Sequence, residues 1–534
     1  MKKTGGRWKF LAWSAVAGVI SGLAFLAAAE LVALLVARGA SPVLAVGSFV
    51  IDIVPQPFKE FAITTFGEYD KLALLAGLGL AVVIASAIAG VLQYLKPPLG
   101  VIALGVAGAL SLAAIVTRAG AGPFAFLPPV VGAVAGSVLL VLLCRRLRRW
   151  ERSTSTPATA VAGGASGADG KSEDDAAPGV DRRRFFVLAG IAAASAIVVG
   201  VTARAVSMAT SSVEAIRGAL RLPAPKTTVT VPAGADLDIP GLTPLFTPNK
   251  DFYRVDTALT VPTIDPQTWR LVIDGMVDKR VELGFDELVA MGLDEYSITL
   301  TCVSNFVGGD LVGNAKWLGV PVRDILRLAG PQSGADMVLS RSVDGYTAST
   351  PLSALTDEGL DAILAVAMNG DPLPLEHGFP VRMVVPGLYG YVSATKWLTE
   401  LKVTTFAQDE AYWTPRGYSE KAPIKFSSRL DTPKISKPVP AGRIPLAGVA
   451  WAQTVGIERV EVSIDNGEWQ VATLSTPVNV NTWVQWVLEW DATPGTHYVT
   501  VRAVNKKGEL QIEESTPIAP DGSTGWQRSL ISVT

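Results

Sequence analysis

Five long apolar stretches alternate with short polar segments in the first 208 residues of the chain. Four of them, Trp8–Ala37, Leu72–Leu95, Leu99–Val116 and Phe124–Cys144, precede a gap, and the fifth, Phe185–Val206, follows it. A helix needs about 20 apolar residues to cross the hydrocarbon layer of a membrane. The pattern therefore predicts a four-helix transmembrane region over residues 1–150 and a fifth spanning helix over residues 182–208.

Basic residues predict the orientation of these helices. They gather before the first helix, between the second and third, and after the fourth: Lys2, Lys3, Arg7, Lys9, Lys96, Arg145, Arg146, Arg148 and Arg149. Cytoplasmic loops carry an excess of such residues, so these ends are predicted to lie inside the cell. The same holds for residues 151–181, whose Ser, Ala, Gly and acidic composition is typical of a flexible linker.

Three arginines stand directly before the fifth apolar stretch. The segment "DRRRFFVLAG", with Arg183 and Arg184 followed by two phenylalanines, resembles a twin-arginine export signal. The alternative is ordinary positive charge ahead of a membrane helix. The export interpretation predicts that everything after this helix lies on the extracytoplasmic side of a bacterial cell membrane, held by a multi-pass anchor.

Small and ionisable residues mark special positions within the predicted helices. Glu30 lies inside the first apolar stretch, where an ionisable residue either has a function or reaches out to the membrane surface. Two glycine pairs have the four-residue spacing of close helix contacts: Gly18 with Gly22, and Gly132 with Gly136.

Histidine and methionine are scarce in the first half of the chain. The first histidine is His377, and no methionine lies between Met1 and Met208. A haem held by two histidines, or by histidine and methionine, is therefore not expected among the predicted membrane helices.

The remainder of the chain has the mixed composition of a soluble protein. A length of 534 residues fits about three domains. The net charge of −2 gives no sign of a basic surface, so we expect no nucleic-acid partner.

In residues 431–534, short runs of alternating apolar and polar residues are separated by Asp-Asn-Gly, Pro-Gly and Lys-Lys-Gly turns, which predicts an all-β sandwich. Its core is expected to contain four tryptophans, Trp469, Trp483, Trp486 and Trp490.

Only two cysteines occur in the chain, and the predicted topology places them on opposite sides of the membrane. Cys144 ends the fourth helix and Cys302 follows a strand-like run, so we expect no disulfide between them. Cys302 is either a buried structural residue or a thiolate ligand to a soft metal. The only histidines, His377 and His497, are too few for an ordinary zinc site.

The residues around Cys302 resemble the sulfite oxidase family of molybdopterin-dependent oxidoreductases. Four segments carry the resemblance: "TPNKDFYRVDTALTVPTIDPQTWRLVIDGMV", "LTCVSN", "AKWLGVPVRDIL" and "MNGDPLPLEHGFPVRMVVPGLYGYVSATKWLTELKV". It implies a mixed α+β molybdopterin-binding domain over residues 209–430. It also implies that residues 431–534 form an immunoglobulin-like domain, which in this family often makes a homodimer contact.

The resemblance assigns a cofactor site residue by residue. Cys302 matches the protein ligand to molybdenum, with the pterin dithiolene and oxo groups completing the coordination. His377 and Arg382 match residues that hold the pterin ring and phosphate, for which an arginine fork is well suited. On local sequence alone, they could equally be a core histidine and an arginine paired with a carboxylate. The remaining matched positions are Asn249, Phe252, Tyr253, Arg254, Ser393, Ala394, Thr395 and Lys396.

The sequence departs from the family's sulfite enzymes after the cysteine. Those enzymes carry an arginine there for a dianionic substrate, whereas this chain reads Cys302-Val-Ser-Asn-Phe-Val and keeps only Arg254 of the cationic pocket. One cation instead of a cluster binds a dianion less well. The resemblance therefore implies a less charged substrate, such as a sulfoxide or an N-oxide. Tyr389 or Tyr391 would donate a proton or hydrogen bond near the metal, unless they are simply packed loop residues.

Together these features predict an oxidoreductase that performs two-electron oxygen-atom transfer on a small oxo substrate. With no haem expected in this chain, electrons would be exchanged with a separate redox protein or a membrane quinone. A catalytically silent membrane receptor that retains the fold is the alternative. An extracellular hydrolase lacks support because no G-x-S-x-G motif is present.

Overall fold

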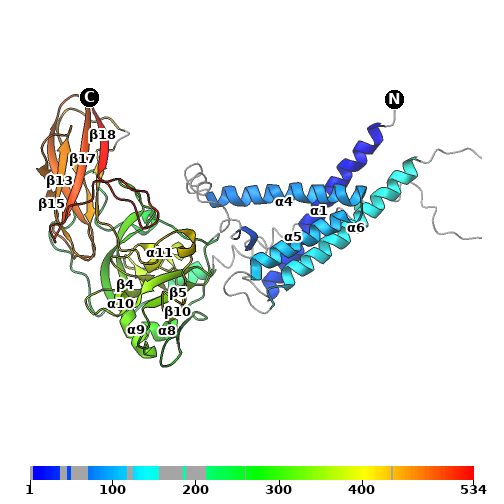
Figure 1. Cartoon of the computed structure of the whole chain (residues 1–534), viewed down its shortest axis with the longest axis horizontal. Helices are drawn as coiled ribbons and strands as arrows, with labels where there is room; N and C mark the ends of the chain where they lie inside the picture. The colour runs from blue at the N-terminus through cyan, green and yellow to red at the C-terminus, as the bar shows by residue number, and fades with distance from the viewer. Residues whose placement is uncertain are drawn as a thin grey trace, which may run out of the picture. The chain divides into compact units, whose positions relative to one another are not determined.

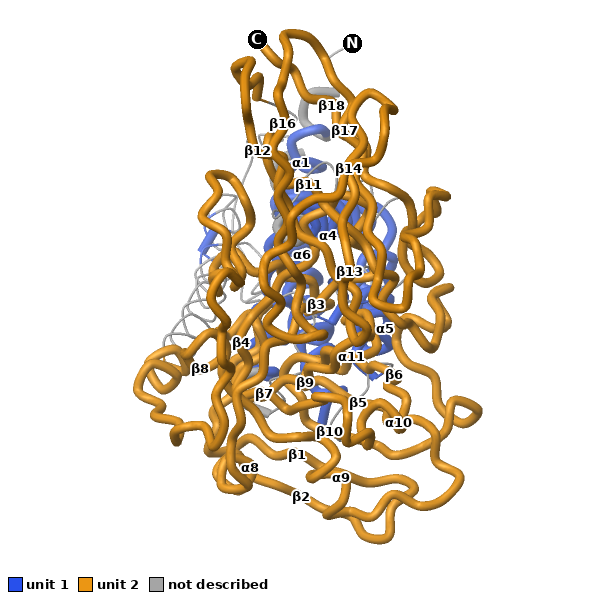
Figure 2. Tube along the Cα trace, turned by 90° about the vertical axis from the view of Figure 1, so that its left-hand side faces the viewer, with its two compact units in different colours: residues 1–210 blue, residues 211–534 orange. Residues whose placement is uncertain are grey.

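The computed structural model describes residues 4–36, 45–47, 49, 70–116, 124–155, 183, 186–187, 190, 212–258, 260–434 and 437–534. The chain forms two compact units, residues 1–210 and 211–534 (Figures 1 and 2). The first unit is helical, and the second contains a mixed α/β region followed by a β region. Each unit is described by itself below.

Four long helices make up the described part of the first unit: α1 (Thr4–Val36), α4 (Asp70–Leu95), α5 (Leu99–Val116) and α6 (Leu127–Ser155). All four are long and apolar enough to cross a membrane, in agreement with the four predicted spans. Helix α6 continues beyond residue 150, so the predicted linker begins as helix. The rest of that linker and most of the predicted fifth helix lie outside the described residues.

The predicted glycine contacts between helices are confirmed. A Cβ at Gly18 or Gly22 of α1 would overlap Ser86 of α4. A Cβ at Gly132 of α6 would lie 2.7 Å from the backbone oxygen of Phe25, and one at Gly136 would lie 3.0 Å from Phe25 Cβ. Small residues thus let α1 approach α4 and α6 closely, as is common where helices pack within lipid.

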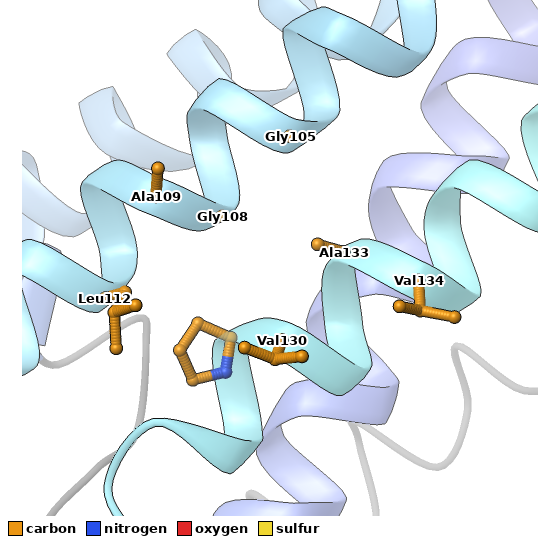
Figure 3. Close-up of a pocket in the computed structure, with 8 residues that line it drawn as sticks. Gly105, Gly108, Ala109, Leu112, Val130, Ala133 and Val134 are labelled. Atoms are coloured by element: carbon orange, nitrogen blue, oxygen red, sulfur yellow. The ribbon is translucent and has the colours of Figure 1, made fainter.

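Small side chains also leave a hollow between α5 and α6 (Figure 3). It has a volume of about 240 Å³ and an apolar lining. The lining includes Gly105, Gly108 and Ala109 from α5, and Val130, Ala133 and Val134 from α6.

Two sheets form the α/β region of the second unit. The first has the strand order β2-β1-β10-β5-β6, and the second has the order β3-β4-β7-β8 with β9 also paired to β7. The strands of the first sheet are β1 (Arg270–Gly275), β2 (Val281–Gly284), β5 (Met337–Ser342), β6 (Thr347–Pro351) and β10 (Leu398–Thr404). Those of the second are β3 (Asp294–Thr301), β4 (Val312–Pro321), β7 (Ile363–Met368), β8 (Asp371–Pro372) and β9 (Arg382–Val384).

Short helices connect these strands. They are α8 (Phe285–Ala290), α9 (Val322–Ala329), α10 (Leu352–Thr356) and α11 (Gly390–Ser393), with the 3-10 turns η3 (Asn249–Asp251), η4 (Leu375–His377) and η5 (Thr414–Arg416). Strand β7, "ILAVAM", is buried at every residue, as its continuous apolar run requires. The presence of both helices and strands in this region confirms the predicted mixture of α and β structure.

The β region consists of two four-stranded sheets with the orders β11-β12-β16-β15 and β14-β13-β17-β18. Their strands are β11 (Ser427–Thr432), β12 (Gly442–Trp451), β13 (Ile457–Ile464), β14 (Gln470–Val471), β15 (Thr473–Leu474), β16 (Val484–Ala492), β17 (Gly495–Asn505) and β18 (Gln527–Val533). This arrangement confirms an all-β region. Its immunoglobulin-like character stays a prediction.

Three of the four tryptophans expected in the β core are buried: Trp483, Trp486 and Trp490. Trp469 is different, because it lies half-buried with the guanidinium of Arg502 stacked 3.8 Å from its ring centroid. Trp469 follows a turn in which Asp465 and Asn466 both have positive φ. Because the turn interrupts the strand, the alternation of inward and outward side chains does not extend to Trp469.

Candidate molybdopterin site

Cys302 directly follows β3, at the start of a loop that returns to β4. Its backbone N–H donates to Leu311 O at 2.9 Å, and its carbonyl accepts from the N–H of Asn305 at 3.0 Å. The side chain is a free thiol that is 8% exposed. The hydrogen bonds at the ends of β3 and β4 therefore hold the buried sulfur of Cys302 in a fixed position.

Ser304 is the polar neighbour of this thiol. Burial raises the pKa of Cys302, and hydrogen bonds from the backbone and hydroxyl of Ser304 lower it.

Three tyrosines are affected by the charge of Cys302: Tyr253 and Tyr346, which are partly buried, and Tyr389, which is buried. For all three, burial raises the pKa of the phenol, and a thiolate at Cys302 raises it further. Arg382 lowers the pKa of Tyr253. Tyr253 is therefore coupled both to the sulfur and to the guanidinium. The hydroxyl of Tyr346 donates to Tyr391 O at 2.7 Å.

His377 ends the turn η4 and is 3% exposed. Its Nε2 lies 3.0 Å from Asn249 O, and its ring packs edge-on against Phe252 with centroids 5.6 Å apart. Burial lowers the pKa of His377 to about 3, with the nearby Arg382 and Lys396 acting in the same direction. The imidazole is therefore neutral at ordinary pH.

Arg382 begins β9 and is 5% exposed. Its Nη1 and Nη2 donate long hydrogen bonds to His377 O (3.2 Å) and Ala394 O (3.4 Å). Its Nε is buried without a partner, and within the described residues no carboxylate forms an ion pair with it. Burial lowers its pKa to about 10, so it keeps its charge at neutral pH. A buried cation with a spare donor fits an anionic group of a cofactor.

A second cation, Lys396, lies beside His377 and Arg382. Lys396 Nζ donates to Asp256 Oδ2 at 2.8 Å and to Glu376 O at 3.0 Å, and burial lowers its pKa to about 8. Arg254 Nε donates to the same oxygen of Asp256 at 2.9 Å, and its side chain is 38% exposed. Arg254 therefore joins the His377 and Lys396 cluster, where it adds to the effect of burial in lowering the pKa values of both residues.

The segment after α11 uses its side chains for internal bonds. Ser393 Oγ donates to Leu388 O and Tyr389 O, and Thr395 Oγ1 lies 2.7 Å from Ser340 Oγ. Of this segment, only the backbone carbonyl of Ala394 accepts a hydrogen bond from Arg382. Any contact of Ser393 or Thr395 with a cofactor would therefore involve their backbone atoms.

The two tyrosines predicted to act near the metal make contacts with the β region and its connector. Tyr391 Oη donates to Ser419 O at 2.6 Å, and Tyr389 Oη accepts from the N–H of Lys425 at 3.4 Å. Burial raises the pKa of Tyr389 to about 12. Tyr346, which sequence reasoning missed, is coupled to Cys302 more directly. It follows the hairpin turn after β5, and no local motif marks it.

No group of three or more His, Cys, Asp or Glu side chains that could hold a metal ion occurs in the described ranges. A metal bound here would have to bring most of its ligands with it. The donor set fits such a group: one buried thiol, a neutral imidazole, and a buried guanidinium whose Nε has no partner.

Comparisons with known proteins relate this chain to molybdopterin-dependent oxidoreductases. Residues 258–413 match the family described as oxidoreductase molybdopterin binding domain. Human mitochondrial sulfite oxidase is 29% identical over 320 residues, covering 51% of this chain and 58% of that protein. Nitrate reductase [NADH] 2 of Phaseolus vulgaris is 28% identical over 307 residues, covering 46% of this chain and 34% of that protein.

Similarity extends to solved structures. The sulfane dehydrogenase SoxCD from Paracoccus pantotrophus matches with a TM-score of 0.48 and 21% identity, covering 57% of this chain and 88% of that one. The chain spans about half the length of the human relative, so its own activity has to be argued from its own residues.

Proposed function

We propose that this chain, which belongs to the sulfite oxidase family of molybdopterin-dependent oxidoreductases, uses a molybdenum–molybdopterin cofactor beside Cys302 to move an oxygen atom to or from a small substrate. One observation carries the proposal. The same α/β region holds a buried free thiol, Cys302, and a buried guanidinium, Arg382, whose Nε has no partner among the described residues. A metal ligand and an anion donor are thus both available.

Each candidate residue has a defined role towards the cofactor. Cys302 would supply the thiolate to molybdenum, and Arg382 would donate Nε–H to the pterin phosphate. Neutral His377 donates its single N–H to Asn249 O, so towards the cofactor it would offer Nδ1 as an acceptor, whereas charged Lys396 would contribute a directed donor. When bound, the cofactor supplies the two-electron redox change and the oxo group.

The tyrosines near Cys302 would act on the substrate. Their raised pKa values keep the phenols protonated at neutral pH, so Tyr253 could donate a hydrogen bond to a substrate oxygen. Tyr389 could do the same, because its hydroxyl only accepts from the N–H of Lys425. Tyr346 and Tyr391 already donate to Tyr391 O and Ser419 O, so each would have to give up that bond first.

The sequence after Cys302 favours a neutral substrate, because residues 303–307 contain no lysine or arginine. A unit charge 4 Å away contributes about 4 kcal/mol at an effective dielectric constant of about 20, so a dianion loses much affinity where a cation is missing. Arg254, the one cation expected in the substrate pocket, forms an ion pair with Asp256, which offsets its charge. A sulfoxide or an N-oxide is therefore the favoured substrate class, ahead of sulfite.

Membrane attachment and electron exchange complete the proposal. Four helices of the first unit could span a bilayer, and the described basic residues Lys96, Arg145 and Arg149 lie at ends that the positive-inside rule assigns to the cytoplasm. The second unit would then work outside the cell after twin-arginine export. It would pass electrons to or from a quinone or a redox protein, and a homodimer through the β region is compatible with this arrangement.

A cysteine replacement tests the proposed function. Cys302→Ser should abolish turnover while the protein still folds, and Cys144→Ser, the matched control, should retain activity. The wild type should contain molybdenum in proportion to protein, and its reduced form should be reoxidised by sulfoxides or N-oxides, read from the molybdenum EPR signal. Protein from molybdenum-replete cells that holds no molybdenum would instead support the silent receptor.

A further inference from the structure

The loop that carries Cys302 makes most of its internal hydrogen bonds near its base. Cys302 and Leu311 are joined by a backbone hydrogen bond, and Asn305 Oδ1 accepts from the N–H of Leu311 at 2.9 Å. Towards its tip, the loop has one backbone bond, from Gly309 N to Phe306 O. Gly308 has φ +79°, a conformation that most other residues would disfavour.

The β region holds the outer part of this loop. Arg429 Nη1 donates to Gly309 O at 2.9 Å, and Ser523 Oγ donates to Asn305 O at 2.9 Å. The side chain of Gln527 packs so closely that a Cβ on Gly308 would lie 2.9 Å from its Cδ. Two separate segments, β11 and the approach to β18, therefore cover one face of the loop.

Arg429 is itself rigidly held. It is 7% exposed, its Nε lies 2.6 Å from Asp431 Oδ1, and its Nη2 donates to Thr243 Oγ1 at 2.9 Å. Asp431 Oδ2 in turn accepts from the N–H of Thr243. Every nitrogen of the guanidinium thus has a partner, and the planar fork fixes where Gly309 O must lie.

The strand before Cys302 is held from the same side. Thr299 of β3 donates its N–H to Asn481 O at 3.0 Å, and its hydroxyl accepts from the N–H of Trp483 at 2.9 Å. The β region therefore contacts the chain both before and after the thiol.

We propose that Arg429 and Ser523 are positioning residues that hold the Cys302 loop, and through it the sulfur, in the geometry needed for metal ligation. The metal part of this proposal rests on the proposed function, whereas the holding of the loop does not. A buried ion pair such as Arg429–Asp431 gives little net stability, since desolvation offsets its attraction. The hydrogen bond from Arg429 to Gly309 O, in contrast, gives this arginine a role in placing Cys302.

Thiol reactivity in the full-length chain tests the proposal. In a Cys144→Ser background, Cys302 is the only thiol, and protein from cells that cannot make the cofactor leaves it unligated. Arg429→Met removes a charge-assisted bond to a buried carbonyl, so the loop should open more often and alkylation of Cys302 should become about tenfold faster. Ser523→Ala should give a smaller increase, and Arg429→Lys should restore part of the protection.

A matched control separates this effect from general destabilisation. Arg443→Met removes an exposed arginine of the same β region, paired with Glu489 at 3.3 Å, and should leave the alkylation rate unchanged. In the holoenzyme, Ser523→Ala should alter the molybdenum EPR spectrum at an unchanged melting temperature. A purely structural role would leave that spectrum as it is.

The proposal is overturned if Arg429→Met and Ser523→Ala, both folded, alkylate at the parent rate. Should Arg429→Met lose its cooperative melting transition, Ser523→Ala decides alone, because it removes only a hydroxyl group. A wild type without molybdenum would contradict the proposed function. The alkylation comparison would still show whether the β region holds the loop.

Discussion

Replacing Arg382 with methionine removes the charge assigned to the cofactor phosphate and keeps much of the side-chain volume. In the folded protein the guanidinium makes two long bonds to carbonyl oxygens, at 3.2 and 3.4 Å, and lies 5.1 Å from the ring centroid of Trp317. Removing it leaves those carbonyls without their donors but also ends the desolvation of a buried charge. Because these effects oppose each other, we expect the melting temperature of the cofactor-free protein to change little.

The affinity for the cofactor should respond far more. A hydrogen bond between charged groups contributes about 1.5–3 kcal/mol, so the loss of Nε and one further donor amounts to about 3 kcal/mol or more. Each 1.4 kcal/mol is a factor of about ten, which gives roughly a hundredfold weaker binding. The variant should therefore lose most of its molybdenum and pterin during purification.

Metal and pterin content per chain, measured by mass spectrometry and by fluorescence, provides the assay, with circular dichroism to check folding. The matched control is Arg341→Met, which breaks the 2.6 Å ion pair with Glu400 on β5 and β10 of the same region. That variant should keep its cofactor. A folded Arg382→Met protein with wild-type molybdenum content would refute the assignment of Arg382 to the phosphate.

Three further outcomes are expected. His377 has a folded-state pKa of about 3 against an ordinary 6.5, so the unfolded state binds more protons between these values. Stability of the cofactor-free protein should thus fall as pH drops from about 6.5 towards 3, and His377→Gln should flatten this dependence in thermal melts. A Cβ at Gly313 would lie 2.7 Å from the ring of Phe252, so Gly313→Ala should destabilise the protein by about 1–3 kcal/mol, measured by denaturation. Arg183→Lys with Arg184→Lys should leave the second unit inside the cell, and normal access to external protease would contradict the export interpretation.

Sequence patterns predicted those features that depend on local composition. Runs of apolar residues located the four membrane-length helices, and the glycine pairs located their closest contacts. Alternation and turn residues gave the β region, including the turn at Asp465 and Asn466. The physical cause of each of these features lies within one segment, so the sequence of that segment is sufficient to predict it.

Features that depend on distant residues were harder to predict. Arg254 matched a substrate-pocket arginine, but its ion pair with Asp256, which also binds Lys396, was not foreseen. Tyr346 donates to Tyr391 O, 45 positions along the chain, and Arg429 donates to Gly309 O across 120 positions. Periodicity carries no signal for such pairs, and one sequence does not reveal them.

The central claim is that the sulfur of Cys302 is bonded to molybdenum. X-ray absorption at the molybdenum edge of the purified holoprotein tests this directly, with Cys302→Ser as the comparison. We expect the wild type to have one more sulfur ligand than the variant. Identical sulfur coordination in the two proteins would contradict the account.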